Sequence, residues 1–254
     1  AINVTDGSRA IMRMNSLSVC KLLLEANIEP VMQLACRDRN RIGLQSDLLG
    51  AYALGIKNVL CLTGDPVHAG DQPDARPVHD FESVQLLKQV TSLNKGIDPV
   101  SGYLPDGCTE LFPGAAADPN CLSFKNLRRR LEKKKEAGAS FLQTQMVMSS
   151  EILERFNNEI AKPLELPVLA GVFLLKSAKN AHFVNRVVPG ACIPDSILAR
   201  LEKAKNPAAE GIAIAAEQTK SFLGITQGVH IMAIKAEDSI PKILELANIN
   251  LQQP

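Results

Sequence analysis

The sequence has no excess of charge of either sign, because 28 lysines and arginines are balanced by 27 aspartates and glutamates, for a formal net charge of +1. This balance offers no electrostatic argument for a nucleic acid or an anionic membrane as partner, and we expect neither. No apolar run approaches the roughly 18 residues that a membrane span requires. The nearest, Val168–Leu175, is typical of a strand. The composition, 46% hydrophobic over 254 residues, predicts a soluble protein with one large core.

The patterns of metal sites and of nucleophilic catalysis are also missing. The six cysteines include no Cys-x-x-Cys pair and the four histidines show no ligand spacing, so we expect no metal site. Most cysteines lie in apolar stretches, which favours buried free thiols in a reducing, cytoplasmic environment over disulfides. Cys36 has no partner base in the sequence pattern, so we interpret it as a packing residue.

What the sequence does contain is a regular alternation of strand and helix patterns, repeated at about 30 residues, the length of a βα unit. Runs such as Asn58–Leu62 are typical of strands buried on both faces of a parallel sheet. The expected strands are 2–5, 31–36, 58–62, 108–117, 140–145, 167–174 and 228–233. Because no hairpin signals interrupt the alternation, we predict an α/β fold with right-handed crossovers, a (β/α)8 TIM barrel. A doubly wound open sheet is the alternative, although no strand precedes Gly-x-Gly-x-x-Gly.

Seven βα units are one fewer than a closed barrel contains. The chain begins inside the strand Ile2–Thr5, with no initiator methionine and no signal peptide. An open seven-stranded barrel would expose an unpaired parallel edge. We therefore expect that the first βα unit is missing from this chain and that residues 1–254 form a single barrel domain.

Asp65 lies just after the buried strand 58–62, where the loops of β/α folds carry catalytic groups. Gly64-Asp65-Pro66 is also ordinary turn sequence. The reading as a site is favoured because other expected strands end in the same way, in hydroxyls, amides and charged groups. These residues are Thr5, Asp6, Gln33, Cys36–Asn40, Thr63, Asp65, Asp118, Gln143, Gln145 and Lys176. Such a ring suits a flat polar heterocycle.

Several segments resemble the methylenetetrahydrofolate reductase family, in the family's order and spacing along nearly the whole chain. They are Asn3–Asp6, Gln33–Asn40, Leu62–Pro66, Ala137–Gln145, Ala170–Val172 and Gly228–Met232. The segment Cys36–Asn40 followed by Thr63–Pro66 is most similar to the short bacterial reductases and to the reductase half of fused homocysteine methyltransferases.

The resemblance implies a flavin-binding barrel and an oxidoreductase of one-carbon metabolism and methionine biosynthesis. FAD is favoured as the flavin and FMN is the alternative. NADH, NADPH or a protein electron donor would reduce the flavin, which would pass hydride to 5,10-methylenetetrahydrofolate and give 5-methyltetrahydrofolate. A homo-oligomer, or a complex with an electron-transfer or activating subunit, is also expected. The alternative function is a non-redox pterin- or folate-binding barrel, a methyltransferase or carrier partner, without flavin.

The resemblance also implies roles for individual residues. Asp65 matches a catalytic aspartate near the flavin pyrimidine and the folate, and Gln145 matches the amide that binds the pterin ring. Flavin contacts are implied for Thr5, Gln33, Thr63, Gly64, Asp118 and Lys134, with Lys134 near the flavin phosphates. Gln33 stands where many members of the family have histidine. The loop at Asp118 also departs from the family's usual pattern on the adenine side, so the choice between FAD and FMN stays open.

Another departure concerns the general acid of the family, which is a glutamate in a Glu-Phe-Phe-Pro-Pro-like run of the first strand. This sequence contains no such run. Regular alternation along Phe141–Gln145 would put Gln145 on the same face as Gln143, at the outer end of the strand. We therefore expect Gln145 to contact ligand and Gln143 to be structural. Asp38 and Asn40 are candidates for capping the helix that follows them.

Overall fold

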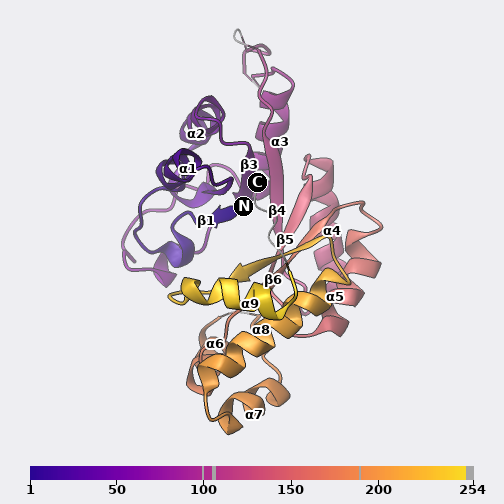
Figure 1. Cartoon of the computed structure of the whole chain (residues 1–254). Helices are drawn as coiled ribbons and strands as arrows, with labels where there is room; N and C mark the ends of the chain where they lie inside the picture. Colours follow the sequence, from indigo (N-terminus) through magenta and orange to yellow (C-terminus); the bar gives the residue numbers. More distant parts are fainter. Residues whose placement is uncertain (99, 105–106, 189, 250–254) are drawn as a thin grey trace. The chain divides into compact units, whose positions relative to one another are not determined.

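The computed structural model describes residues 1–98, 100–104, 107–188 and 190–249 (Figure 1). Its strands are β1 (Ile2–Val4), β2 (Pro30–Ala35), β3 (Asn58–Leu62), β4 (Phe112–Ala117), β5 (Phe141–Met146), β6 (Val168–Phe173) and β7 (Gly228–Met232). Its α-helices are α1 (Ser16–Glu25), α2 (Arg41–Ala53), α3 (Ser83–Asn94), α4 (Phe124–Glu136), α5 (Ser150–Phe156), α6 (Ala178–Val187), α7 (Asp195–Lys203), α8 (Pro207–Leu223) and α9 (Ile240–Leu246). The predicted alternation of strands and helices is confirmed.

The chain divides into two compact units. The first unit consists of Ala1–Ala116 and Arg130–Phe141, and the second of Ala117–Arg129 and Leu142–Pro254, of which the structure describes residues up to 249. Every strand pairing described within either unit is parallel. The parallel α/β class is therefore confirmed, while closure into an eight-unit barrel and a missing first unit stay predictions.

In the first unit, β1 to β4 pair in chain order, with Ile2 opposite Pro30, Val31 opposite Asn58 and Asn58 opposite Phe112. All six residues of β2 are buried, and the three central residues of β3, the predicted continuous apolar run, are buried as well, as expected of strands covered on both faces. Helices α1 and α2, indigo and violet in Figure 1, begin at asparagine caps. Asn15 accepts a hydrogen bond from the backbone N–H of Ser18, and Asn40 accepts one from Gly43, which confirms the predicted capping role of Asn40.

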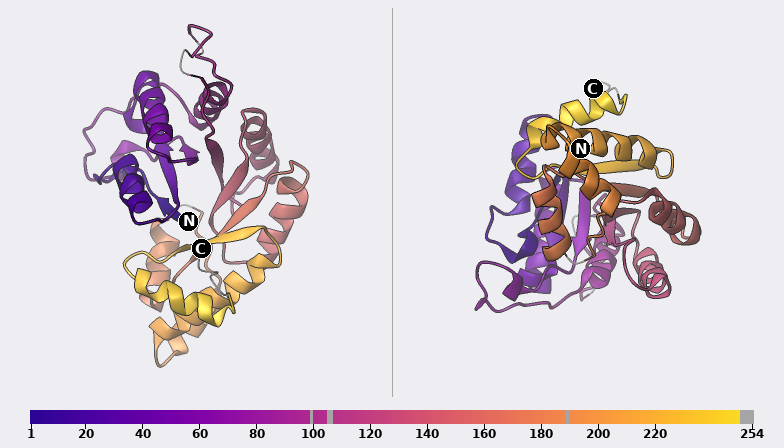
Figure 2. Two further views of the ribbon diagram at one scale, coloured as in Figure 1. Left: turned by 45° about the horizontal axis from the view of Figure 1, so that its top comes forward. Right: turned by 90° about the horizontal axis from the view of Figure 1, so that it is seen from below.

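In the second unit, β5, β6 and β7 pair in parallel and α8 packs on β6, β7 and α9. Figure 2 shows α8 in orange and β7 and α9 in yellow from two further sides. A buried cluster that includes Met146, Leu175, Leu201 and Ile214 joins β5 and the segment after β6 to helices α7 and α8. This apolar packing gives β5 a fixed support at its carboxyl end.

The strand predicted at 108–117 begins only at Phe112. The reason is the side chain of Asn94 at the end of α3, whose Oδ1 accepts hydrogen bonds from Thr109 Oγ1 at 2.6 Å and from the backbone N–H of Leu111 at 2.9 Å. These bonds hold the preceding residues against the end of α3, outside the sheet. The strand predicted at 31–36 differs in a smaller way, because Cys36 begins a short 3₁₀ turn between β2 and α2 and does not continue β2.

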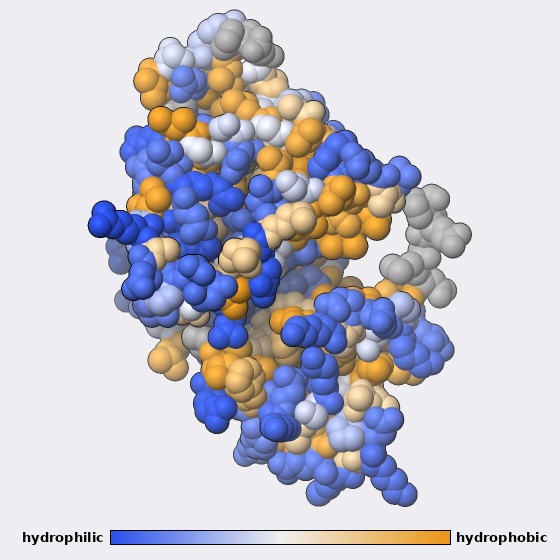
Figure 3. All heavy atoms as spheres, turned by 90° about the vertical axis from the view of Figure 1, so that its left-hand side faces the viewer, coloured by the Kyte–Doolittle hydropathy of each residue, from blue (hydrophilic) through white to orange (hydrophobic). Residues whose placement is uncertain are grey.

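The surface view in Figure 3 shows hydrophobic residues in several separate groups among hydrophilic ones. Large apolar side chains exposed in the structure include Met12, Leu22 and Ile42. Within the described ranges, no helix combines the length and the apolar character that crossing a bilayer would require.

Candidate functional site

The segment after β3 has a conformation that depends on glycine. Gly64 has a φ of +96°, and a Cβ added there would lie 2.7 Å from Cβ of Arg37, so both the backbone angle and the space exclude a side chain. Thr63 precedes it and its Oγ1 accepts a hydrogen bond from the backbone N–H of Ser83 at 3.2 Å, at the start of α3. The turn at Gly64 therefore packs closely on Arg37.

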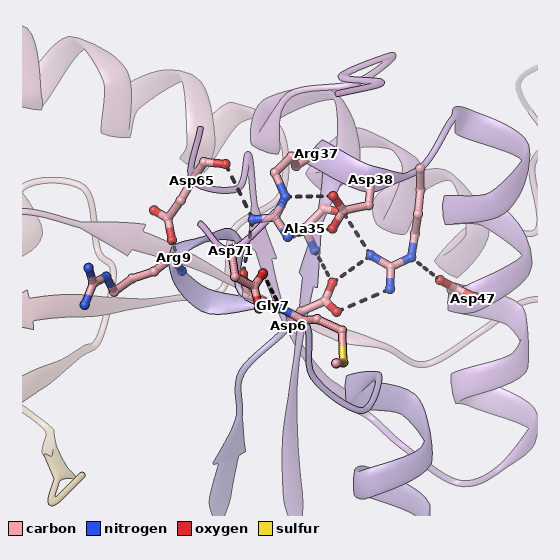
Figure 4. A network of polar contacts seen from close by, with 11 residues as sticks. Asp6, Gly7, Arg9, Ala35, Arg37, Asp38, Asp47, Asp65 and Asp71 are labelled. Atoms are coloured by element: carbon pink, nitrogen blue, oxygen red, sulfur yellow. Dashed lines mark hydrogen bonds and ion pairs between the residues drawn. The ribbon is translucent and has the colours of Figure 1, made fainter. Parts of the chain in front are cut away.

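Asp65 follows this turn and its side chain is exposed. One carboxylate oxygen, Oδ2, accepts a hydrogen bond from the backbone N–H of Arg9 at 2.6 Å, and the carbonyl of Asp65 accepts a longer one from Nη1 of Arg37 at 3.5 Å (Figure 4). The hydrogen bond from Arg9 thus fixes one oxygen of the carboxylate, while the side chain remains accessible to a ligand. It lies at the carboxyl end of a buried strand, as the sequence predicted.

Arg37 connects the segments that follow β1, β2 and β3. It belongs to the predicted ring of polar residues at the strand ends, but the sequence indicated no role for Arg37 itself. Its guanidinium is buried, with Nε and Nη2 donating to the two oxygens of Asp38 at 2.7 and 2.6 Å and Nη1 donating to the carbonyl of Gly7 at 3.1 Å. The hydrogen-bonded carboxylate of Asp38 raises the pKa of Arg37. Asp38 therefore pairs with Arg37, although capping of the next helix had been considered for it. The sequence did contain a signal for such ion pairs, because the short segment Cys36–Asn40 carries two arginines, Arg37 and Arg39.

Asp6, one of the predicted ring of polar residues, is buried in a second ion pair. Its Oδ2 accepts hydrogen bonds from Nη1 of Arg39 at 2.7 Å and from the backbone N–H of Ala35 at 2.9 Å. Nε of Arg39 lies 2.7 Å from a carboxylate oxygen of Asp47 on α2 (Figure 4). These contacts tie the end of β1 to β2 and α2. We therefore assign Asp6 a structural role.

A pocket of about 290 Å³ adjoins these two ion pairs within the first unit. Its lining comes from the loops after β1, β2 and β3, and its charged members are Asp6, Arg13, Arg37, Asp38, Arg39 and Arg76. A guanidinium group has five N–H donors, and four of those of Arg37 and four of those of Arg39 already donate to aspartates or backbone carbonyls, so both groups serve mainly as part of the wall. The pocket is a recess with both charged and apolar lining residues, beside the loop that carries Asp65.

The predicted flavin contacts Thr5 and Gln33 belong to the region of the neighbouring strands β1 and β2. Thr5 is exposed just after β1, and Gln33 is buried in β2. Asn3 is opposite Val31, so Asn3 and Gln33 share one face of the sheet. Within the described part of the chain, the buried Oδ1 of Asn3 has no hydrogen-bond partner. A buried acceptor without a donor is costly, so this face is suited to a ligand that brings an N–H or O–H group.

Lys134 on α4 belongs to the same unit. Its Nζ donates a hydrogen bond to the carbonyl of Ala116 at 2.7 Å. Burial is the largest cause that lowers the pKa of Lys134 to about 8, and the charge of Arg130 lowers it further. An ammonium group has three N–H donors, so two remain for an anion, and an anion nearby would favour the charged form.

Two predicted site residues lie in the second unit. Asp118 follows β4 and its Oδ1 accepts a hydrogen bond from the backbone N–H of Asn120 at 3.0 Å, which closes a local turn. Gln145 is exposed near the end of β5, while Gln143 is buried. The regular alternation predicted for this strand is wrong, because the pairing with β6 shifts register between Gln143 and Met146.

Cys36 is buried, and burial raises its pKa to about 12. The thiol is neutral near neutral pH, so the interpretation as a packing residue is confirmed. Cys20 and Cys61 are also buried, while Cys108 and Cys192 are exposed. In the ranges that the structure describes, no three side chains of histidine, cysteine, aspartate or glutamate come together as a metal-binding group.

The fold is that of a parallel α/β protein with polar groups where several of its strands end. Residues 1–248 match the family described as "Methylenetetrahydrofolate reductase". The chain therefore belongs to the methylenetetrahydrofolate reductase family.

Individual relatives agree with this result. The chain is 28% identical over 231 residues to "Methylenetetrahydrofolate reductase (NADH) 1" of Arabidopsis thaliana, with 85% of this chain and 38% of that protein covered. It is 25% identical over 262 residues to "Methylenetetrahydrofolate reductase 2" of Schizosaccharomyces pombe, with 96% and 40% covered. The chain thus spans two fifths or less of the length of these relatives.

Among solved structures, the fold is similar to that of an uncharacterized protein from Clostridium thermocellum described as binding two copies of 5-methyl-5,6,7,8-tetrahydrofolic acid. The TM-score is 0.59 and the identity 15%, with 89% of this chain and 73% of that chain covered. At this identity the likeness concerns the fold alone.

Proposed function

We propose that this chain is the catalytic domain of a flavin-dependent reductase that converts 5,10-methylenetetrahydrofolate to 5-methyltetrahydrofolate. The observation that carries the proposal is Asp65, an exposed carboxylate at the end of β3 in a chain that matches the reductase family over residues 1–248. Its backbone is supported by Gly64 and Arg37. Such a fixed carboxylate suits catalysis better than a mobile turn does, because preorganised charge needs no rearrangement during reaction.

The residues present fit a flavin. Asn3 offers a buried acceptor without a donor on the face that it shares with Gln33, and Lys134 offers two N–H donors to a phosphate. Thr5 and Thr63 supply hydroxyl groups at the strand ends, beside Gly64, while Asp118 is assigned to the adenine side. When bound, the flavin supplies hydride transfer. FAD is favoured over FMN, and NADH, NADPH or a protein donor is the reductant.

Asp65 has the catalytic role in this proposal. Opening of the five-membered ring of the folate substrate produces a cationic iminium before hydride arrives. A carboxylate held close to that nitrogen stabilises positive charge as it develops, which is the most effective form of electrostatic assistance. Gln145 has the binding role, because an amide with one acceptor and two donors is complementary to the donor and acceptor edge of a pterin.

The proposal also includes the complete fold of the domain. It is a (β/α)8 barrel in which residues 1–254 form one flavin- and folate-binding domain. A cytoplasmic location and a homo-oligomer, or a complex with an electron-transfer or activating subunit, complete the assignment.

The second candidate is a pterin- or folate-binding barrel without flavin. The description of the C. thermocellum protein as a binder of methyltetrahydrofolate favours a folate site in this fold, which both candidates require.

The visible absorption spectrum of the full-length protein tests the choice. We expect bound flavin that is bleached by NADH, NADPH or a chemical reductant and reoxidised by methylenetetrahydrofolate. Folate binding by a protein that takes up neither FAD nor FMN would establish the second candidate in its place. Binding of neither folate nor flavin would refute both.

A further inference from the structure

Strand β5 ends in a β-bulge. Gln143 is opposite Leu169 and Met146 is opposite Gly171, so three steps along β5 match two steps along β6. One residue of β5 is therefore extra, which is the definition of a bulge. Gln145 is exposed, while its neighbours Thr144 and Met146 are buried. The bulge interrupts the alternation of the strand and determines where the Gln145 side chain emerges.

In this bulge, the backbone N–H of Gly171 on β6 donates to the side-chain hydroxyl of Thr144, in place of a backbone carbonyl of β5. Its Oγ1 accepts a hydrogen bond from the backbone N–H of Gly171 at 2.9 Å and donates one to the carbonyl of Gln145 at 2.6 Å. The hydroxyl thus uses its donor and one of its acceptors at once. Because Thr144 is buried, a side chain of the same shape without the hydroxyl would leave the Gly171 N–H without a partner.

His230, on β7, holds the preceding peptide group, the one that joins Thr144 to Gln145. Its Nε2 lies 2.8 Å from the carbonyl oxygen of Thr144, and because a carbonyl only accepts, Nε2 donates this hydrogen bond. Burial lowers the pKa of His230, which favours the neutral ring. The imidazole reaches from β7 past β6 to β5.

Because Gly171 on β6 has no side chain, it leaves room for the imidazole of His230. It is opposite His230 in the pairing of β6 with β7. A Cβ at Gly171 would lie 2.6 Å from the carbonyl oxygen of Gln145 and 3.0 Å from Nε2 of His230. The absence of a side chain on β6 therefore permits both the close approach of the bulge and the hydrogen bond from β7.

We propose that Thr144, Gly171 and His230 are positioning residues that fix the peptide of Gln145 and so orient its side-chain amide toward the pterin ring of folate. The inference deepens the proposed function and rests on the role of Gln145 given there. All four residues lie in the second unit. Bulges commonly redirect a side chain next to an active site, and here one hydroxyl and one imidazole hold the redirected residue from two sides.

The test uses the full-length protein with its flavin and two matched pairs of variants. Thr144→Val removes the hydroxyl and Thr144→Ser keeps it. His230→Leu removes the donor, and His230→Gln keeps an N–H at a similar distance from the backbone.

We measure the Kd of 5-methyltetrahydrofolate by calorimetry and the rate at which the reductant reduces the bound flavin. We expect Thr144→Val and His230→Leu to raise the Kd by about three- to tenfold, the value of one buried hydrogen bond. Thr144→Ser and His230→Gln should stay close to wild type, and flavin reduction should not change.

A double-variant cycle with Gln145→Ala separates positioning from general stability. If Thr144 acts through Gln145, the double variant Thr144→Val, Gln145→Ala binds no more weakly than Gln145→Ala alone. Additive effects, or equal loss in Thr144→Val and Thr144→Ser, would overturn the inference. If Gln145→Ala weakens binding and neither Thr144→Val nor His230→Leu does, the inference fails and the role of Gln145 stands. If Gln145→Ala leaves the Kd unchanged, both the role of Gln145 and the inference are overturned. Should Thr144→Val fail to fold, the His230 pair decides between the same outcomes through its own cycle with Gln145→Ala.

Discussion

Replacement of Lys134 by methionine should make the flavin-free protein more stable near neutral pH. The pKa of Lys134 is lowered from 10.5 to about 8, chiefly by burial. Each unit of pKa corresponds to about 1.4 kcal/mol, so holding this lysine charged costs the folded state about 3 kcal/mol near pH 7. Loss of the hydrogen bond to Ala116 offsets about 1 kcal/mol. The expected net gain for Lys134→Met is about 2 kcal/mol.

The sign of the pH dependence follows from the same values. Between about pH 8 and pH 10.5 the unfolded chain keeps the proton on this lysine and the folded chain releases it, so this residue makes stability rise with pH in that window. The cost is fully present below the folded pKa. In denaturant unfolding of the flavin-free proteins, Lys134→Met should therefore be more stable than wild type near neutral pH. The order should reverse near pH 10.5, where wild type loses the cost of the charge and keeps the hydrogen bond to Ala116, worth about 1 kcal/mol.

Flavin binding provides the second half of this test. If a flavin phosphate contacts Lys134, it stabilises the charged form, so wild-type flavin affinity should fall as the pH rises above about 8. Lys134→Met should bind flavin more weakly and without this pH dependence. Lys133 on the same helix is exposed, and Lys133→Met is the matched control. Equal flavin affinity and the same pH profile in wild type and Lys134→Met would refute the assignment of Lys134 to the phosphate.

Three further predictions concern the loops that carry the site. Asp65→Asn should lower turnover by an amount equivalent to about 2.7–4 kcal/mol of barrier, with a much smaller change in unfolding free energy because the side chain is exposed; turnover close to wild type would leave Asp65 as a turn residue only. Gly64→Ala should destabilise the protein by about 1–3 kcal/mol and reduce activity as well, because φ is +96° and the new Cβ meets Arg37; an unchanged melting temperature would argue against the close packing of this turn. Gln145→Ala should weaken folate binding by about 1–3 kcal/mol while the reductive half-reaction stays near wild type; equal damage to both half-reactions would assign Gln145 to the flavin or to the fold.

Local sequence determined most of the elements of this protein. Strand β3 occupies Asn58–Leu62, the range predicted from its apolar run. Helix α8 occupies Pro207–Leu223, with a proline in its first turn and Gly224 directly after its last residue. Such signals lie within a few residues of the structure that they specify. The exposed positions of Asp65 and Gln145 near strand ends could be predicted for the same reason. Their neighbours in the sequence show where each strand stops.

Contacts between residues far apart in the chain were decided only by the tertiary structure. The delayed start of β4 depends on Asn94, and the support of Asp65 depends on Arg37, which is 28 residues away. The bulge at Thr144 requires a glycine on β6 and a histidine 86 residues further along the chain. The alternation of a strand is a local rule, whereas the pairing of its backbone with the next strand is not. The side-chain direction of Gln145 is therefore a property of three strands together.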